Sequence, residues 1–363
     1  MGTAVICHLI GIFCILFYTS SMHILGIETS CDETAVAIVK DGTEVYANSI
    51  SSSVLQFEKL AGVIPEEAAR LQLEYMIPVI QDALKAAGMQ PADIDAIAVT
   101  RGPGLLGSLL VGTTTARMLA AIWQKPLIGV HHTLGHLSST WLGTGPANAP
   151  VFPVLTLSAS GGHTDIWYRT SHMHGSLIGR TRDDAAGEAF DKGASMLGLP
   201  YPGGPHIARM AAEGNEKAYP FPLPLHGDSS CDFSFSGLKT SLKYLLRDLP
   251  EPFAVSDIAA SYEHALCRHL VDRLRKAVEL HPDTREVHLV GGVSANNHLR
   301  LLTSSLCHEY AVTLRYPLLN MYCTDNAAMI ASAGYFQLME EPETVTANFE
   351  TEASLSLQKT LAE

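Results

Sequence analysis

The sequence lacks several patterns that would place it in common classes of protein. Its seven cysteines form no CxxC pair, so neither a zinc ribbon nor a disulfide framework is indicated, and a reducing compartment fits best. No GxxxxGK[ST] loop occurs, which excludes a Walker-type phosphate site. No repeat of solenoid period is present either, which excludes a repeat architecture. These absences leave a globular protein whose functional site belongs to none of these classes.

Positive charge is also scarce. There are 24 Lys and Arg residues against 37 Asp and Glu, giving a formal net charge of -13, which argues against a surface that binds polyanions in general. A nucleic-acid partner would need a local basic patch or a helper protein. Arg268, Arg273, Arg275 and Lys276 form a basic run on a predicted helix, although such a run is more often a solvated face.

The N-terminus lacks the charges of a targeting sequence. No Lys or Arg precedes Lys40, whereas a secretory signal has a positive n-region and a mitochondrial transit peptide has arginines. The apolar run at 4–18 is also shorter than the ~20 residues that span a bilayer. We interpret residues 1–21 as an upstream extension, with Met22 as the functional start. A weak membrane anchor is the less favoured interpretation, and no membrane partner is expected.

The remaining sequence alternates strand and helix patterns, which predicts an α/β protein. Its 363 residues, 47% of them hydrophobic, can bury two lobes. Three strands are predicted at 23–28, 34–40 and 44–51, then a helix at 65–87, and a helix at 106–123 between strands at 96–100 and 126–130. A strand pattern restarts at 151, and a strand at 286–290 and a helix at 326–338 follow. We expect a first lobe at 22–150, a second at 151–320, and a segment at 321–363 that packs back toward the first.

Three turns that follow predicted strands are rich in glycine, hydroxyl or acidic groups. They are Gly26–Thr34, Ser158–Thr164 and Gly291–Asn297. The glycines of the second turn let backbone amides close on an anion, and the third leads into a helix whose N-terminus suits a phosphate. Each turn alone is more often a plain connection. Together they predict a nucleotide held in a cleft between the lobes.

A histidine pair fits a metal site, and on its own it fits two surface or supporting histidines equally well. His132 and His136 are four residues apart on a predicted helix, so their imidazoles project from one face, and Asp325 offers a third ligand. Two histidines and one carboxylate suit iron(II) or zinc and leave positions open for substrate. A metalloprotease would have HExxH, but Thr133 follows the first histidine, which disfavours that function.

The ordered motifs resemble those of the catalytic subunits of bacterial and mitochondrial tRNA threonylcarbamoyladenosine synthases, once called glycoproteases. The resemblance covers about residues 22–340. Its motifs are GIETSCDETAVAIV (26–39), GVIPEEAAR (62–70), RGPGLLGSLLVG (101–112), VHHTLGHL (130–137), SASGGHT (158–164), DDAAGEAFDKGASMLGLPYPGGP (183–205), FSFSGLKT (233–240), GGVSANNHLR (291–300) and CTDNAAMIASAG (323–334). It implies the actin-like ATPase fold, with two lobes around a central nucleotide cleft.

The resemblance also implies roles for matching residues. His132, His136 and Asp325 match the metal ligands of a family usually assigned iron, with zinc as the alternative. The substrate-binding positions that match are Ser158, Ala159, Ser160, Gly161, Gly162, Asp191, Gly204 and Asn296. Asp32, Glu33 and Asp184 are acidic candidates for catalysis, and none is singled out as the base.

The implied reaction transfers threonylcarbamoyl from threonylcarbamoyl-AMP to N6 of adenosine 37, in tRNAs that read codons beginning with adenine. The products are t6A and AMP. A bound metal would position phosphate and carbamoyl oxygens. The implied partners are tRNA and, in a bacterial cytoplasm, a noncatalytic paralogous subunit and a small ATPase; a mitochondrial protein would form a homodimer. A carbamoyltransferase acting on a small molecule is the nearest alternative function, ahead of a metalloprotease.

The chain departs from the family pattern at three places. Gln72 stands where the family usually has histidine, Glu263 where it usually has glutamine, and CTDNAAM replaces CTDNGAM. None of these changes removes an expected metal ligand. We expect Gln72 and Glu263 to alter partner docking or an allosteric surface.

Overall fold

The structure is a computed structural model that describes residues 21–52, 64–145, 148–250, 252–345 and 348–361. The chain divides into two compact units. Unit 1 contains residues up to 149 together with 325–360, and unit 2 contains 150–324 with Leu361. The apolar run expected to be an extension or anchor, 4–18, lies outside the described residues.

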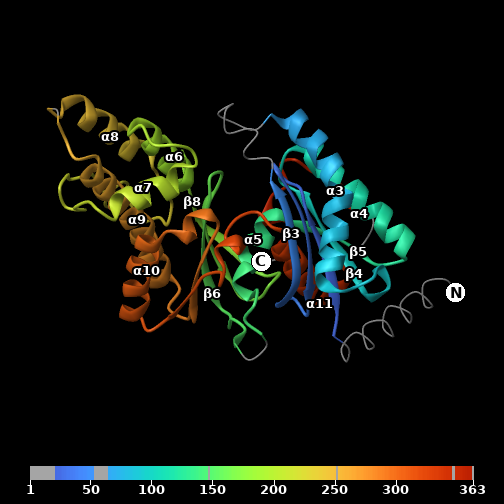
Figure 1. Ribbon diagram of the computed structural model, residues 1–363. Helices are drawn as coiled ribbons and strands as arrows, with labels where there is room; N and C mark the ends of the chain where they lie inside the picture. The colour runs from blue at the N-terminus through green and yellow to red at the C-terminus, as the bar shows by residue number, and fades with distance from the viewer. Residues whose placement is uncertain (1–20, 53–63, 146–147, 251, 346–347, 362–363) are drawn as a thin grey trace. The chain divides into compact units, whose positions relative to one another are not determined.

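Unit 1 is built on a five-stranded sheet in the order β3-β2-β1-β4-β5 (Figure 1). The strands are β1 His23–Glu28, β2 Glu33–Lys40, β3 Glu44–Ser52, β4 Ala96–Gly102 and β5 Leu127–His131. The first three form an antiparallel meander, and β4 and β5 run parallel to β1. All five strands predicted for this part of the chain are confirmed.

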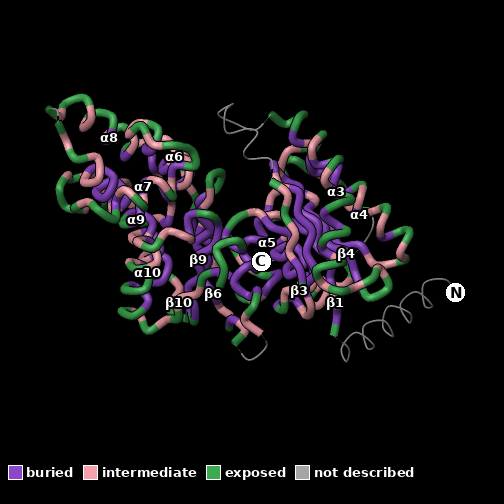
Figure 2. Tube along the Cα trace, viewed as in Figure 1, coloured by how far each residue is buried: buried purple, intermediate pink, exposed green. Residues whose placement is uncertain are grey.

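Two helices cover one face of this sheet. They are α3 (Pro65–Ala87) and α4 (Leu106–Trp123), and both share a core with Leu25 and Ile27 of β1. The predicted start of α3 is confirmed, because Pro65 occupies the first turn, and Glu66 and Glu67 lie beside the positive helix end. Figure 2 shows the strands of the sheet as a largely buried layer.

Helix α4 is long and apolar enough to cross a membrane, judged by length and composition alone. It connects β4 to β5, which are neighbouring parallel strands, and this connection requires a crossover. One face of α4, including Leu109 and Ala116, is buried. Its apolar character therefore fits a crossover helix packed on a sheet.

Helix α11 (Ala327–Glu340) covers the opposite face of the sheet and makes its closest approach at a glycine. A Cβ atom on Gly26 of β1 would lie 2.3 Å from the carbonyl oxygen of Ala327 and 2.8 Å from the backbone nitrogen of Ala331. Side chains alternate along a strand, so Gly26 and Glu28 face α11 while Leu25 and Ile27 face α3. Glu28 thereby points toward the start of α11.

Unit 2 repeats the sheet topology of unit 1, in the order β10-β9-β6-β7-β8. Its strands are β6 Val154–Ala159, β7 Thr164–Arg169, β8 Gly175–Arg180, β9 Glu286–Val290 and β10 Thr313–Arg315. Again three strands form an antiparallel meander, and two run parallel to its first strand. The predicted strands near 151 and at 286–290 are confirmed, whereas β7, β8 and β10 lie outside those predicted from the sequence.

Five α-helices in the described part of unit 2 share one core with this sheet. They are α6 Ala186–Met196, α7 Gly203–Ala211, α8 Ser236–Asp248, α9 Val255–Leu280 and α10 Asn297–Glu309. Side chains from β6, β7 and β9 share one core with α6, α9 and α10, including Phe190, Leu270 and Leu299. The turn at Gly291 also needs a glycine, because its φ is +83° and a Cβ there would lie 2.4 Å from the carbonyl oxygen of Ala159.

We expect Gly26→Ala to displace the start of α11. The added methyl group would overlap the Ala327 carbonyl, and overpacking of this kind typically costs about 1–3 kcal/mol. Urea denaturation should show the loss of stability, and the affinity for divalent metal should fall because Asp325 immediately precedes α11. Gly237→Ala is the control, since apart from its chain neighbours and the backbone of its own helix no atom of the described residues lies within 4 Å of the place its Cβ would take. Equal effects of the two substitutions would contradict this account.

Candidate metal centre and nucleotide-binding turns

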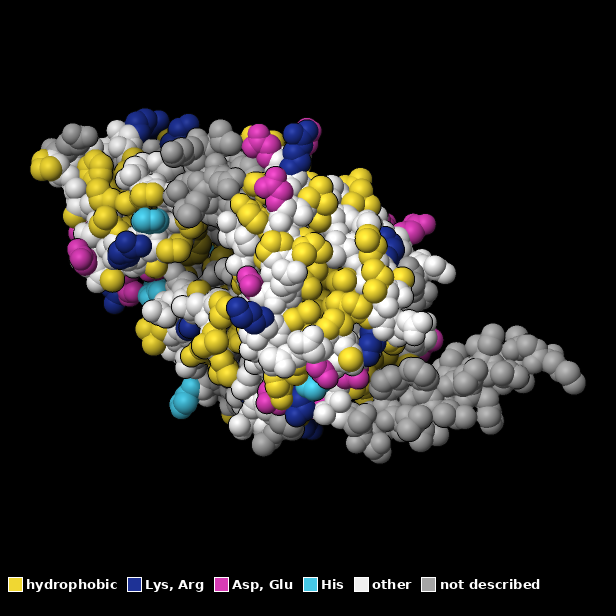
Figure 3. All heavy atoms as spheres, turned by 45° about the vertical axis from the view of Figure 1, so that its right-hand side comes forward, with side chains coloured by type: hydrophobic (Ala, Val, Ile, Leu, Met, Phe, Trp, Pro, Cys, Tyr) yellow, Lys and Arg dark blue, Asp and Glu magenta, His cyan; other side chains and the backbone are white. Residues whose placement is uncertain are grey.

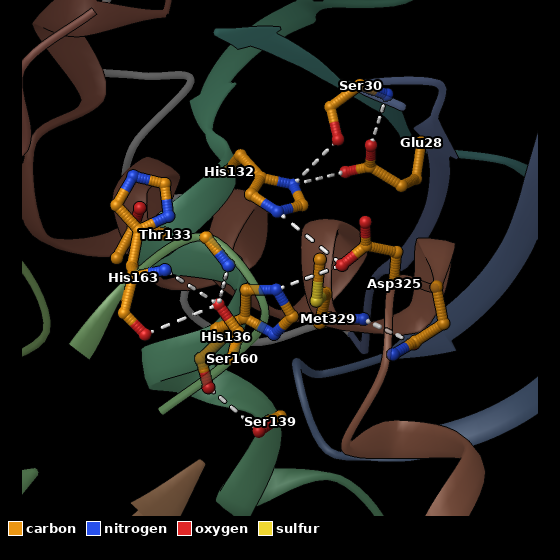
Figure 4. A network of polar contacts seen from close by, with 12 residues as sticks. Glu28, Ser30, His132, Thr133, His136, Ser139, Ser160, His163, Asp325 and Met329 are labelled. Carbon is orange, nitrogen blue, oxygen red and sulfur yellow. Dashed lines mark hydrogen bonds and ion pairs between the residues drawn. The ribbon is translucent and has the colours of Figure 1, made fainter. Parts of the chain in front are cut away.

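The three predicted metal ligands lie together in unit 1 (Figure 4). Helix α5 (His132–Ser138) presents both histidines from one face, and Asp325 lies just before α11. Asp325 Oδ1 is 3.5 Å from His132 Nε2 and 3.1 Å from His136 Nε2. The donor set of two imidazole nitrogens and one carboxylate oxygen fits a divalent transition metal. The Asp325 side chain is 26% exposed, so an ion can reach the group from solvent.

Glu28 orients the first histidine. Its Oε2 lies 3.1 Å from His132 Nδ1, and the same carboxylate accepts hydrogen bonds from the Ser30 amide and the Thr100 hydroxyl. With Nδ1 donating to Glu28, His132 Nε2 is left to face Asp325. This carboxylate–histidine arrangement is the usual support of a histidine that binds a metal. Sequence reasoning missed Glu28. Its position at the end of β1, two residues after Gly26 and on the same face of the strand, was a signal that could have identified it.

The electrostatics of the group favour a cation. Burial disfavours the charged imidazole, but the carboxylates of Glu28 and Asp325 outweigh burial and raise the pKa of His132 to about 9. A proton is therefore held where an ion would bind, and metal binding at such a site is expected to release protons.

His131 has a structural role. It ends β5 and caps α5, because its Nδ1 accepts a hydrogen bond from the Thr133 amide. Its Nε2 lies 3.1 Å from the Leu355 carbonyl oxygen, to which it can only donate. Both ring nitrogens are thus occupied within unit 1, which fixes the tautomer.

Two of the three acidic candidates lie beside the metal group. Asp32 is buried, and Glu33 begins β2. Burial, then the charges of Asp325 and Asp32, raise the pKa of Glu33 to about 9, so its carboxyl group holds a proton at neutral pH. An ion bound at Asp325 would offset part of this effect.

Asp184 lies in unit 2 and is held by two lysines. Its carboxylate oxygens are 2.6 Å from Lys239 Nζ and 3.1 Å from Lys192 Nζ. Partial burial works against the charge, but the hydrogen bonds from these lysines lower the pKa of Asp184. A carboxylate so stabilised is a weak base, and its geometry is that of a structural ion pair.

The predicted anion-binding turn is a tight hairpin between β6 and β7. Ser158 and Ala159 are buried in β6, and the exposed glycines Gly161 and Gly162 follow Ser160. The Ser160 hydroxyl accepts from the amides of Gly162 and His163, at 3.3 and 3.2 Å. Two of the amides expected to face an anion are therefore turned toward a serine, and a phosphate would have to replace these long contacts.

Asp191 and Gly204 lie at the junction of two helices. The Asp191 carboxylate in α6 accepts a 2.7 Å hydrogen bond from the Gly203 amide at the start of α7. Burial raises the pKa of Asp191, while hydrogen bonds from the Gly203 and Gly204 amides oppose that shift. The structure thus brings the two predicted residues together in unit 2.

Asn296 caps the helix after the third turn. Its Oδ1 accepts from the Leu299 amide, which starts α10, and its Nδ2 donates to Glu263 at 2.6 Å. The predicted strand-to-helix turn is confirmed, with a short 3-10 segment at Gly292–Ala295 before α10.

Two arginines of the basic run on α9 are engaged within unit 2. Arg273 is fully buried and donates to the carbonyl oxygens of Leu225, Asp228 and Ser230. Arg275 is paired with Glu309. The favoured interpretation of this run as a solvated face is therefore wrong for Arg273, which stabilises unit 2 from within.

The sequence profile of the family described as tRNA N6-adenosine threonylcarbamoyltransferase matches residues 44–332. The chain belongs to this family. The resemblance inferred from the motifs is confirmed.

Bacterial relatives of this family are similar over most of the chain. A tRNA N6-adenosine threonylcarbamoyltransferase of Symbiobacterium thermophilum is 49% identical over 315 residues, which is 86% of this chain and 91% of the relative. One of Bacillus subtilis is 44% identical, over 86% of this chain and 90% of the relative.

Solved structures with low sequence identity share the fold. Component A of (R)-2-hydroxyglutaryl-CoA dehydratase from Acidaminococcus fermentans is 16% identical with a TM-score of 0.51, covering 86% of this chain and 98% of that one. HypF from T. kodakarensis is 14% identical with a TM-score of 0.60, covering 90% of this chain and 48% of that one. The expected actin-like ATPase fold is confirmed, and the nucleotide cleft between lobes stays a prediction.

The departures from the family pattern are buried. Gln72 of α3 donates to the carbonyl oxygens of Cys31 and Glu33, at 3.1 and 2.9 Å, and so braces the turn after β1. Glu263 holds Asn296. Gln72 is 1% exposed and Glu263 7%, so neither side chain itself forms part of an exposed surface. Each contacts predicted site residues, and an effect on partner docking or an allosteric surface stays a prediction.

We expect Glu28→Gln to weaken metal binding about 10- to 100-fold, because a partner that orients a histidine ligand typically contributes that much. Calorimetric titration of the metal-free protein with Zn²⁺ measures the change. Glu44→Gln is the control. Glu44 is an exposed carboxylate that pairs with Lys40, and Lys40 ends β2, whereas Glu33 near the metal centre begins it. Unchanged affinity in Glu28→Gln would remove Glu28 from the metal centre.

Proposed function

We propose that the chain transfers the threonylcarbamoyl group of threonylcarbamoyl-AMP to N6 of adenosine 37 in tRNAs that read codons beginning with adenine. The products are t6A and AMP. The observation that carries the proposal is family membership, with 49% identity to a relative over 86% of the chain. The group formed by His132, His136 and Asp325 supports it. A bacterial cytoplasm is the proposed location, with the mitochondrion as the alternative.

The donor set is proposed to hold one divalent ion, iron(II) or zinc. When bound, that ion would supply a Lewis acid that positions phosphate and carbamoyl oxygens. Glu28 keeps His132 in the required tautomer, and the packing of α11 holds Asp325 near both histidines.

The nucleotide is proposed to lie against unit 2. The amides of the Ser158–Gly162 turn would bind its phosphate, Asp191 and Gly204 its ribose, and Asn296 its base. Ser160, Gly161 and Gly162 form the turn after β6, and Gly204 lies at the start of α7, where backbone amides are available. Asp191 and Asn296 already bind helix N-termini, so each arrives pre-oriented.

The acidic candidates have different proposed roles. Attack by N6 requires a proton to leave the amine. Hydrogen bonds from two lysines lower the pKa of Asp184, which makes its carboxylate a weak base. Glu33 holds a proton in the metal-free structure and is suited to donate a hydrogen bond to an oxygen of the departing phosphate. The Asp32 carboxylate, next to Glu33, is the remaining candidate to accept the proton.

An apolar surface on α3 and α4 supports a subunit partner. Its exposed side chains are Leu73, Ile77, Leu106, Leu110, Met118 and Ile122. Those of α4 are four or eight residues apart, and α3 packs beside α4. Figure 3 shows hydrophobic side chains gathered on this side of unit 1. Apolar patches of this kind mark interaction sites, so we assign the surface to a noncatalytic paralogue or to a second copy of this chain.

A transfer assay tests the reaction. Wild-type protein, given threonylcarbamoyl-AMP, unmodified tRNA and its partner subunits, should form t6A. His136→Ala should lose bound metal and slow the transfer about a hundredfold or more, because Lewis-acid stabilisation is worth several kcal/mol. His226→Ala, at an exposed position, is the control.

The assay also separates the alternatives. Absence of t6A from wild-type reactions would overturn the main proposal and favour a carbamoyltransferase acting on a small molecule. Cleavage of a protein substrate that depends on His136 would instead favour a metalloprotease. Normal metal content in His136→Ala would remove that residue from the ligand set.

Sedimentation velocity tests the subunit surface. Replacing Ile77 and Met118 together by glutamate should abolish association, because two charges would be buried without partners. Leu280→Glu is the control, since Leu280 is similarly exposed on α9 of unit 2. Association with the paralogue or with a second copy identifies the partner. Undiminished association of the double variant would refute this surface.

A further inference from the structure

A second group of ligand side chains lies in unit 2. Glu216 is in the turn after α7, His264 is in the middle of α9, and His298 is in the first turn of α10. His264 Nδ1 is 3.0 Å from His298 Nε2. Glu216 Oε2 is 3.5 Å from the first of these nitrogens and 3.7 Å from the second. Three separate segments thus bring their donor atoms to one point.

We propose that Glu216, His264 and His298 form a second metal site, which binds zinc or a divalent ion with similar ligand preferences. Zinc bonds of 2.0–2.2 Å at tetrahedral angles put neighbouring donor atoms about 3.3 Å apart. The three observed separations of 3.0 to 3.7 Å span this value. An ion placed between the atoms therefore needs only small side-chain shifts.

The chemistry of the group suits zinc. Imidazole nitrogen and carboxylate oxygen are both zinc ligands, and three protein ligands leave a fourth position for water or an exogenous group. The side chains are partly exposed, from 19% for His298 to 41% for Glu216, so an ion can enter from solvent. Lys217 and Arg268 also act on His264 electrostatically, and their charges oppose that of an ion. We therefore expect weaker binding here than at His132 and His136, where several carboxylates converge.

The site adjoins the predicted nucleotide turn. His264 follows Glu263, whose carboxylate holds Asn296, and His298 lies two residues after Asn296. An ion would tie α9, α10 and the turn after α7 to one another. Its consequence is a more rigid position for Asn296, independent of the metal centre in unit 1.

The test uses the full-length chain with the first site removed by His132→Ala and His136→Ala. Calorimetric titration of this metal-free background with Zn²⁺ should show one ion bound per chain. Adding His264→Asn and His298→Asn should weaken binding at least about tenfold. His308→Asn, an exposed histidine on the same helix as His298, is the matched control.

A second variant guards against loss of fold. Glu216 lies in a partly exposed turn, so Glu216→Gln should leave the far-ultraviolet circular dichroism unchanged. Zn²⁺ should raise the melting temperature of the background but raise it less in Glu216→Gln, because a ligand stabilises the state that binds it. Absence of zinc binding in the background, or equal binding after replacement of His264 and His298, would overturn the proposal. Transfer activity is not measured, so this result is independent of the proposed reaction.

Discussion

The metal centre of unit 1 depends on the close packing of α11 against the sheet. A helix can approach a strand at backbone distance only where no side chain intervenes, and Gly26 provides that place. Gly135 of α5 leaves room for side chains of α11, because a Cβ there would lie 2.7 Å from Ile330 Cδ1 and 3.1 Å from Met329 Cγ. Asp325 precedes α11 and both histidines are on α5, so the ligand geometry follows from two glycine contacts. The packing of the helices therefore places the three ligand side chains near one another before any ion is bound.

The charges around that centre have a common origin. Glu28, Asp32, Glu33 and Asp325 place more carboxylates near one point than His132 and His136 can neutralise. The pKa of the basic side chain His132 and that of the acidic side chain Glu33 are both raised, to about 9. For His132 the neighbouring carboxylates outweigh burial, whereas for Glu33 burial is the largest cause and the charges of Asp325 and Asp32 add to it. The negative charge around the site therefore contributes to both shifts. A divalent cation meets the same electrostatic need at a defined position.

The sequence allowed much of the fold and part of the site to be predicted. Hydrophobic periodicity located the strands of unit 1, and the spacing of His132 and His136 put them on one helix face. Glu28 was missed because its importance depends on strand register, which connects it to His132 across 104 positions. The basic run on α9 was misjudged for the opposite reason, since periodicity does not reveal that Arg273 is buried by a loop. Long-range burial of polar groups is the information that local patterns lack.

Unit 1 is assembled from the two ends of the described chain, with unit 2 between them. His136 and Asp325 are 189 positions apart, so at 5–20 residues per second a ribosome adds the carboxylate roughly 10–40 s after the histidine. During that interval the nascent chain has both imidazoles but lacks the ligand that joins them. Any product truncated before α11 would also lack the helix that packs on Gly26. The complete set of three ligands is thus a property of the finished polypeptide, and an interrupted chain cannot acquire it.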